Sequence, residues 1–246
     1  MSSRARQAGF TLIELMIVVA LIAVIAAIAI PRMLSARLSA NEAAAISTLR
    51  SIATAQAQIR SSGAIDTDLD GAGEYAYFGE LSGAQPVRVS AAGVPAAGVV
   101  GTDELFPTIL SNSFGRVSNR VASRQGYMFQ MWLPSATGGG GAVGAVPEDL
   151  TGGKLAAPFP DSNNGEILWS CYAWPVEVGK SGNRAFFASH EGELLQFLNR
   201  SANPYTNTTK TPPFDEAFAA PGDMSSALRI GVAGGADGTV WTPVQI

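Results

Sequence analysis

The chain has 246 residues, of which 47% are hydrophobic and 15% are charged, and its formal net charge is −4. A mildly acidic chain lacks the surplus of Lys and Arg that neutralises phosphates, so nucleic acid is not an expected partner. The single cysteine, Cys171, excludes an intrachain disulfide, and the single histidine, His190, excludes a zinc site made of several histidines. The length leaves room for one soluble domain of roughly 200 residues beyond an N-terminal apolar segment.

The N-terminus combines a short basic leader with a long apolar run. Two arginines precede Gly9, and the run from Phe10 to Ile30 contains a single ionisable side chain, Glu14. About 20 apolar residues span a bilayer, so residues 10–30 are predicted to form a transmembrane helix. The preceding arginines place residues 1–9 in the cytoplasm. A carboxylate within a membrane costs roughly 3 kcal/mol, which indicates that Glu14 has a function.

The order of Gly9, Phe10 and Glu14 before an apolar run resembles the class III signal sequence of type IV pilins and of type II secretion pseudopilins. The resemblance implies that a prepilin peptidase cuts between Gly9 and Phe10 and methylates the new Phe10 amine. It also implies that Glu14 pairs with the Phe10 amine of a neighbouring subunit during filament assembly. An ordinary secretory signal would be cleaved after its apolar core. A simple membrane anchor would explain the length of the run but not Glu14.

Pro31 marks a change in composition. Because proline lacks an amide hydrogen and clashes with the preceding turn, we expect Pro31 to kink or locally melt the helix. Residues 31–62 are predicted to form an amphipathic helix that packs on a sheet. Its apolar residues recur at helical spacing: Leu38, Ala45, Leu49, Ile52 and Ile59. Gly63 suits the left-handed position that ends a helix.

The remainder divides into a connecting region at 63–126, an antiparallel sheet at 127–200 and a C-terminal tail at 201–246. Within the connecting region we expect one short helix at Asp103–Leu110. Alternating apolar residues predict strands at 127–133, 167–178, 184–189 and 193–198, the last two forming a hairpin. The stretch 135–164 is predicted to be loop. The fold class expected is α+β and pilin-like: a long N-terminal helix packed on a C-terminal antiparallel sheet.

The tail is rich in Asn, Thr, Pro and Gly, so little regular structure is expected there. It nevertheless contains large aromatic side chains that we expect to dock on the sheet: Tyr205, Phe214, Phe218 and Trp241. The aromatic residues of the predicted strands, and Cys171 among them, are interpreted as core.

The segment after the helix has acidic residues at alternate positions, Asp66, Asp68 and Asp70, followed by Gly71. Alternating carboxylates and a glycine begin a calcium-binding loop of the EF-hand kind. The twelfth position is Tyr77 instead of Glu, so Glu74 is the expected fourth ligand, with Glu80 beyond it as the alternative. A solvated acidic turn without calcium is the alternative, and the sequence leaves both open.

No pattern indicates an enzyme. His190 is predicted to lie at a hairpin turn, and neighbouring acids such as Glu191 and Glu193 give no evidence of facing one another across a substrate. The glycine run at 138–141 lacks the Lys and Ser/Thr of a phosphate-binding loop.

The function favoured is a structural subunit of a type II secretion pseudopilus, because no disulfide can form and an acidic loop follows the helix. A major or minor pilin of a type IV pilus, serving adhesion, motility or DNA uptake, stays open. So does a membrane-tethered binding module or enzyme. The partners implied are the prepilin peptidase, other pilins or pseudopilins, and an inner-membrane assembly platform. The chain is expected to cross the bacterial inner membrane once, with its head in the periplasm, and to enter a filament.

Overall fold

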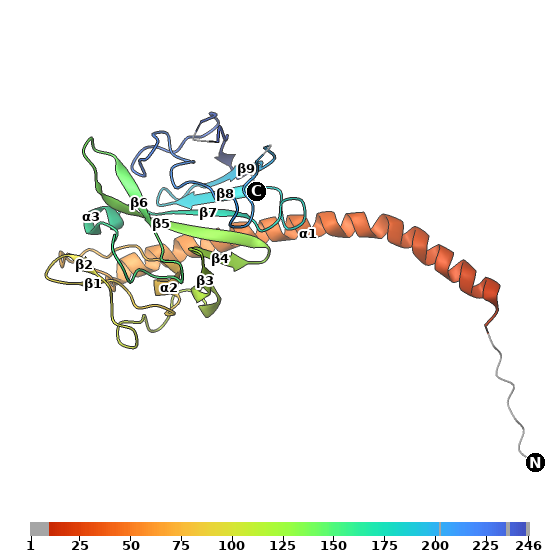
Figure 1. Ribbon diagram of the computed structural model, residues 1–246, viewed down its shortest axis with the longest axis horizontal. Coiled ribbons are helices and arrows are strands. Elements are labelled where there is room, and N and C mark those ends of the chain that lie inside the picture. The colour runs from red at the N-terminus through yellow and green to blue at the C-terminus, as the bar shows by residue number, and fades with distance from the viewer. Residues whose placement is uncertain (1–9, 202, 235–236, 245–246) are drawn as a thin grey trace, which may run out of the picture.

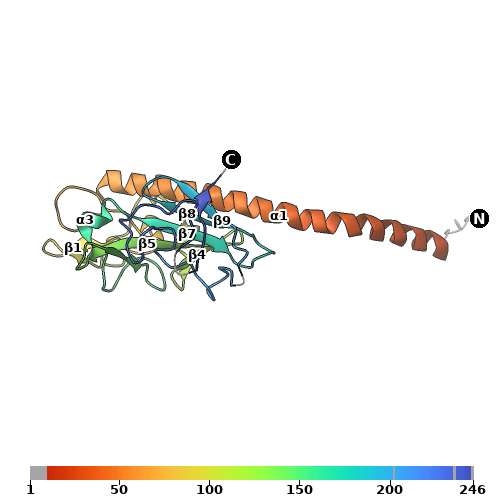
Figure 2. The ribbon, with the colours of Figure 1, turned by 90° about the horizontal axis from the view of Figure 1, so that it is seen from above.

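The structure, a computed structural model, describes residues 10–201, 203–234 and 237–244. The predicted leader, including Gly9, lies outside the described residues. A single long helix, α1 (Leu12–Ser62), carries a head of mixed α and β structure at its C-terminal half (Figure 1). Seen at right angles, the N-terminal half of α1 projects from the head without touching it (Figure 2). The expected α+β architecture is confirmed.

Helix α1 is continuous through Pro31. Proline removes one backbone hydrogen bond and crowds the carbonyl four residues earlier, which belongs to Ala27. The helix accommodates this crowding without a break, and α1 curves gradually over its N-terminal half (Figure 1). Local melting at Pro31 therefore does not occur. At the other end, Gly63 adopts φ 62° and its amide donates to the carbonyl of Arg60, as expected of a helix-ending glycine.

The head is built on an eight-stranded antiparallel sheet with the order β10-β9-β8-β7-β5-β4-β3, and β6 pairs with β5 outside this path. The strands are β3 (Val117–Ser118), β4 (Val121–Arg124), β5 (Tyr127–Thr137), β6 (Val143–Pro147), β7 (Ser170–Pro175), β8 (Ala185–Ser189), β9 (Leu194–Phe197) and β10 (Thr242–Pro243). The predicted hairpin is confirmed, since β8 pairs with β9 from Ala188 opposite Leu194 to Ala185 opposite Phe197.

Each face of the sheet is covered by a different part of the chain. Strand β7 shows the division, because successive side chains point to opposite faces. Cys171 and Ala173 lie in the core that the sheet shares with α1, while Tyr172 and Trp174 lie in a second core. The tail supplies the other side of the second core through buried residues that include Tyr205, Phe218, Met224 and Trp241. The docking expected of the tail aromatics is therefore confirmed.

The predicted helix at Asp103–Leu110 is wrong. The segment is irregular, and Pro107 in its middle has no amide hydrogen to continue a helix. The short helices lie elsewhere, at α2 (Phe78–Leu81), η1 (Asn112–Gly115) and α3 (Ser162–Gly165).

The loop predicted at 135–164 is also wrong in part. Strand β5 extends to Thr137, β6 returns along it, and the glycine run 138–141 forms the turn between them. The main sheet begins earlier than residue 127, because β3 and β4 belong to it. The connecting region also holds the small pair β1 (Val89–Ser90) and β2 (Pro95–Ala96).

Candidate functional site

The first turn of α1 places Glu14 beside its own N-cap residue, Thr11. The Thr11 hydroxyl and amide both donate to Oε2 of Glu14, at 2.6 Å and 2.9 Å, and the Glu14 amide donates to the Thr11 hydroxyl at 3.3 Å. This is a capping box, in which two otherwise unpaired backbone amides are satisfied. Thr11 was not singled out from the sequence, although the spacing Thr-x-x-Glu is the signature of this motif.

The second carboxylate oxygen of Glu14, Oε1, has no hydrogen-bond partner among the described residues. The capping box therefore orients the carboxylate and leaves one oxygen free. Phe10 immediately precedes the cap and is 92% exposed. The two residues whose pairing the resemblance implies thus lie at the same end of α1, and both are open to another molecule.

The N-terminal half of α1 is uncovered. Its large apolar side chains are exposed, from Leu12 at 75% to Ile30 at 59%, and no residue between 10 and 40 is buried. The helix is long and apolar enough to cross a membrane. An apolar surface of this size on all sides of one helix marks a segment that is buried by lipid or by other chains.

The C-terminal half of α1 is anchored to the head by polar contacts as well as apolar ones. Arg184 donates to Glu42 at 2.7 Å, and the amide of Asn183 donates to the same carboxylate at 2.9 Å. Asn41 donates to the carbonyl of Ser181 at 2.9 Å. These bonds fix the level along α1 at which the head begins.

The predicted calcium loop is formed in part. Carboxylate oxygens of Asp66, Asp68 and Asp70 lie within 4.8 Å of one another, and Gly71 has φ 93°. The same carboxylates accept backbone amides of the loop, including that of Gly71 to Asp66 at 3.0 Å. Calcium binding stays a prediction, and the loop also fits the acidic turn that was its alternative.

Glu74, the expected fourth ligand, is not part of this group. Its side chain is fully buried and accepts from Arg88 at 3.0 Å and from the amide of Thr67 at 2.8 Å. Arg88 also donates to Glu80 at 3.0 Å, so one buried guanidinium joins two buried carboxylates. Burial opposes the charge on Arg88, but the two carboxylates outweigh it, and the pKa of Arg88 is raised. Glu74 therefore holds the connecting region together. No local pattern in the sequence indicates this long-range pairing.

Glu166 is the acid that approaches the loop. Its burial, and next the charges of Asp70 and Asp68, raise the pKa of the Glu166 carboxyl. Asn163, three residues earlier, donates to Asp68 at 3.2 Å. The α3 region, distant in sequence, thus adds a carboxylate near the loop where the sequence suggested Glu74.

The single cysteine and the single histidine of the chain both lie in the head. Cys171 is fully buried, and burial raises the pKa of its thiol well above the ordinary value. His190 follows β8 at the predicted turn, and partial burial lowers its pKa. Burial keeps the Cys171 thiol away from solvent, which agrees with its interpretation as core.

Comparison with known proteins bears on the N-terminal motif and on about half of the chain. Residues 4–30 match the family described as prokaryotic N-terminal methylation motif. The chain is similar to the type IV major pilin protein PilA of Myxococcus xanthus (strain DK1622), with 34% identity over 146 residues. That alignment covers 54% of this chain and 62% of the relative, which is less than two thirds of the relative's length. No solved structure matches the chain. The motif, the apolar helix ahead of an antiparallel sheet and this relative support the resemblance of the chain to type IV pilins.

Proposed function

We propose that the chain is a structural subunit of a type IV pilus, held in the inner membrane by α1 until it joins a filament. The observation that carries the proposal is the N-terminal half of α1. It is apolar on all sides, uncovered by the head, and contains one acid, whose Oε1 is free. Packing of such helices side by side would bury their apolar surface.

In this proposal the prepilin peptidase cuts between Gly9 and Phe10 and methylates the Phe10 amine. The amine of an incoming subunit then pairs with Glu14 of a subunit already in place. A charge pair in an apolar filament core is favourable only when its geometry is good, and the capping box holds the Glu14 carboxylate in one orientation. The head would remain on the periplasmic side before assembly.

The choice between pilus and pseudopilus depends on the relative. The similarity to a type IV major pilin favours a pilus subunit, whereas the absence of an intrachain disulfide and the acidic loop after α1 favour a pseudopilin. The similarity is the stronger argument, because the alignment extends over 146 residues and therefore beyond the shared N-terminal motif. A deletion strain separates the two. Loss of surface filaments with normal protein secretion indicates a pilus subunit, and the reverse indicates a pseudopilus.

The direct test is the N-terminus of the chain in filaments sheared from cells. We expect mass spectrometry to find a mature chain that begins with N-methylated Phe10. Gly9→Val should leave the unprocessed chain in the membrane and no chain in filaments. Absence of the wild-type chain from every filament, with processing intact, would contradict the proposal.

A further inference from the structure

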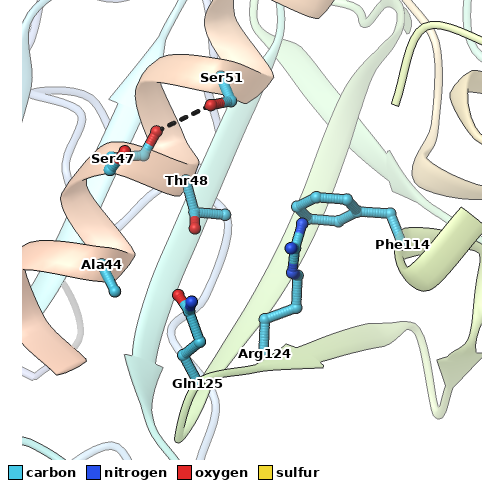
Figure 3. A pocket seen from close by; sticks show the side chains of 7 residues that line it. All are labelled: Ala44, Ser47, Thr48, Ser51, Phe114, Arg124 and Gln125. Carbon is cyan, nitrogen blue, oxygen red and sulfur yellow. Dashed lines mark hydrogen bonds between the residues drawn. The ribbon is translucent and has the colours of Figure 1, made fainter. Parts of the chain in front are cut away.

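A polar groove lies between α1 and the turn that joins β4 to β5. It has a volume of about 270 Å³ and is lined by Ala44, Ser47, Thr48, Ser51, Phe114, Arg124 and Gln125 (Figure 3). The turn is tight, since Gln125 and Gly126 have φ 48° and 78°, as in two-residue hairpins. Arg124, the last residue of β4, is thereby held at the groove.

Arg124 is oriented but has no anionic partner. Its guanidinium lies over the ring of Phe114, 4.4 Å from the ring centroid, and the ring itself is 2% exposed (Figure 3). The guanidinium forms no ion pair or hydrogen bond within the described part of the chain. Stacking leaves the edge of a guanidinium, with its five donors, free to bind a carboxylate with two parallel hydrogen bonds. The hydroxyls of Ser47 and Thr48 are further donors at the groove.

The segment of chain that supplies Arg124 to the groove carries positive charge. Between Glu104 and Glu148 the chain has three basic residues, Arg116, Arg120 and Arg124, and no acidic one. On the adjoining stretch of α1 the acid is Glu42, which is already paired with Arg184. In a chain of formal charge −4, the segment that supplies Arg124 is thus basic.

The opposite charge lies at the other end of the head. The loop with Asp66, Asp68 and Asp70 follows the C-terminus of α1, and these acids have no basic partner among the described residues. From Thr48 at the groove to Ser62 the helix rises about 21 Å. The groove therefore lies nearer the projecting half of α1 than the acidic loop does.

We propose that the Arg124 groove of one copy binds carboxylates of the Asp66–Asp70 loop of a second, parallel copy. The inference rests on the proposed filament, in which parallel α1 helices are displaced along their common direction. Such displacement brings the Arg124 groove of one head toward the Asp66–Asp70 loop of another. The charges of these two regions are complementary. Asp70 is the most exposed of the three acids and is the expected partner.

The test is a charge exchange in the full chain, with the amount of sheared filament as the readout. Arg124→Glu and Asp70→Arg should each lower that amount about tenfold, and the combined variant should restore it. Arg200→Glu, an equal change at an exposed arginine elsewhere on the head, should have no effect. If Arg124→Glu behaves like Arg200→Glu, or the exchange fails to restore filaments, the proposal is overturned.

A cross-link gives a second readout that does not depend on the charge reversals folding. Filaments with Ser51→Cys and Asp70→Cys should yield covalent multimers on a non-reducing gel, while either cysteine alone should not. A pair of Ser51→Cys and Asp103→Cys is the matched control. Filaments that contain the chain but give no Ser51–Asp70 multimers contradict the groove contact only, whereas a chain missing from all filaments contradicts the proposed function.

Discussion

The two halves of α1 belong to one continuous helix but lie in opposite environments. From Leu12 to Ile30 the large apolar side chains are exposed, whereas Leu49, Ile52 and Ile59 of the second half are fully buried against the sheet. Both halves are helical because both are rich in good helix formers. The first half can be buried only by lipid or by neighbouring subunits, so its sequence should determine assembly. The second half is buried within its own chain, so its sequence should determine the stability of the head.

The largest effect is expected at Glu14. Glu14→Ala removes the free carboxylate oxygen while leaving the cleavage site intact, so processing and membrane insertion should persist. Loss of one partner from a buried pair costs about 3–5 kcal/mol, which corresponds to at least a hundredfold loss of incorporation into filaments. Quantitative blotting of sheared filaments measures it.

Thr11→Val is the matched control for Glu14. It removes the capping hydroxyl, at a cost of about 1 kcal/mol, but keeps the carboxylate. Filament yield should fall much less than in Glu14→Ala. Equal yields for Glu14→Ala and the wild type would show that the charge pair is not needed, and the two halves of α1 would then differ in burial alone.

A pair of leucine substitutions compares the two halves directly. Leu49→Ala removes a fully buried side chain and should lower the free energy of unfolding of the head by about 2–5 kcal/mol. Leu21→Ala, on the exposed half, should change it by less than about 0.5 kcal/mol. Urea denaturation of the full chain in detergent, followed by tryptophan fluorescence, reports on the head, where all four tryptophans lie. A comparable loss in both variants would mean that the projecting half contributes to folding of the head.

The carboxylates of the two regions also differ. Glu14 is not covered by any other described part of its own chain, whereas Glu148 is fully buried after β6. Oε1 of Glu148 accepts the amides of Gly79 and Gly153, at 2.7 Å and 2.8 Å, and its Oε2 has no partner in the described structure. Burial, only partly offset by these amides, raises the pKa of Glu148 from 4.5 to about 8.

This shift predicts how the stability of the head depends on pH. Between pH 4.5 and about 8 the folded chain keeps a proton on Glu148 that the unfolded chain has released. The contribution of Glu148 to stability is therefore greatest below pH 4.5 and decreases by a few kcal/mol as the pH rises to about 8. Glu148→Gln should flatten this part of the profile, and Glu191→Gln, at an exposed site, should not. An unchanged slope in Glu148→Gln would show that Glu148 is ionised in the head at neutral pH.

The sequence predicts best where a pattern is local. The N-terminal motif, the apolar stripe through Leu49 and the β8–β9 hairpin all depend on spacing within a short segment. The sequence predicts poorly where the structure depends on distant partners. Strand β6 consists of small residues after a glycine run and is recognisable only through its pairing with β5. The pairing of Glu74 with Arg88 joins residues without periodic context, so Glu74 looked like a loop ligand.

The smallest effect expected concerns the acidic loop. If Asp66, Asp68 and Asp70 bind calcium, millimolar calcium should release heat on titration and stabilise the monomeric chain in detergent by about 1 kcal/mol, a rise in melting temperature of a few degrees. The monomer is required, because Arg124 of a second copy would compete with calcium for these carboxylates. Asp66→Asn with Asp70→Asn should abolish both signals, while Asp103→Asn should not.

Glu74→Gln is uninformative about calcium, since it disrupts the buried pairing with Arg88. Glu166→Gln instead tests whether the acid from the α3 region completes the site. Unchanged heat and melting temperature at millimolar calcium would leave the loop as a charged surface, free for contact between heads.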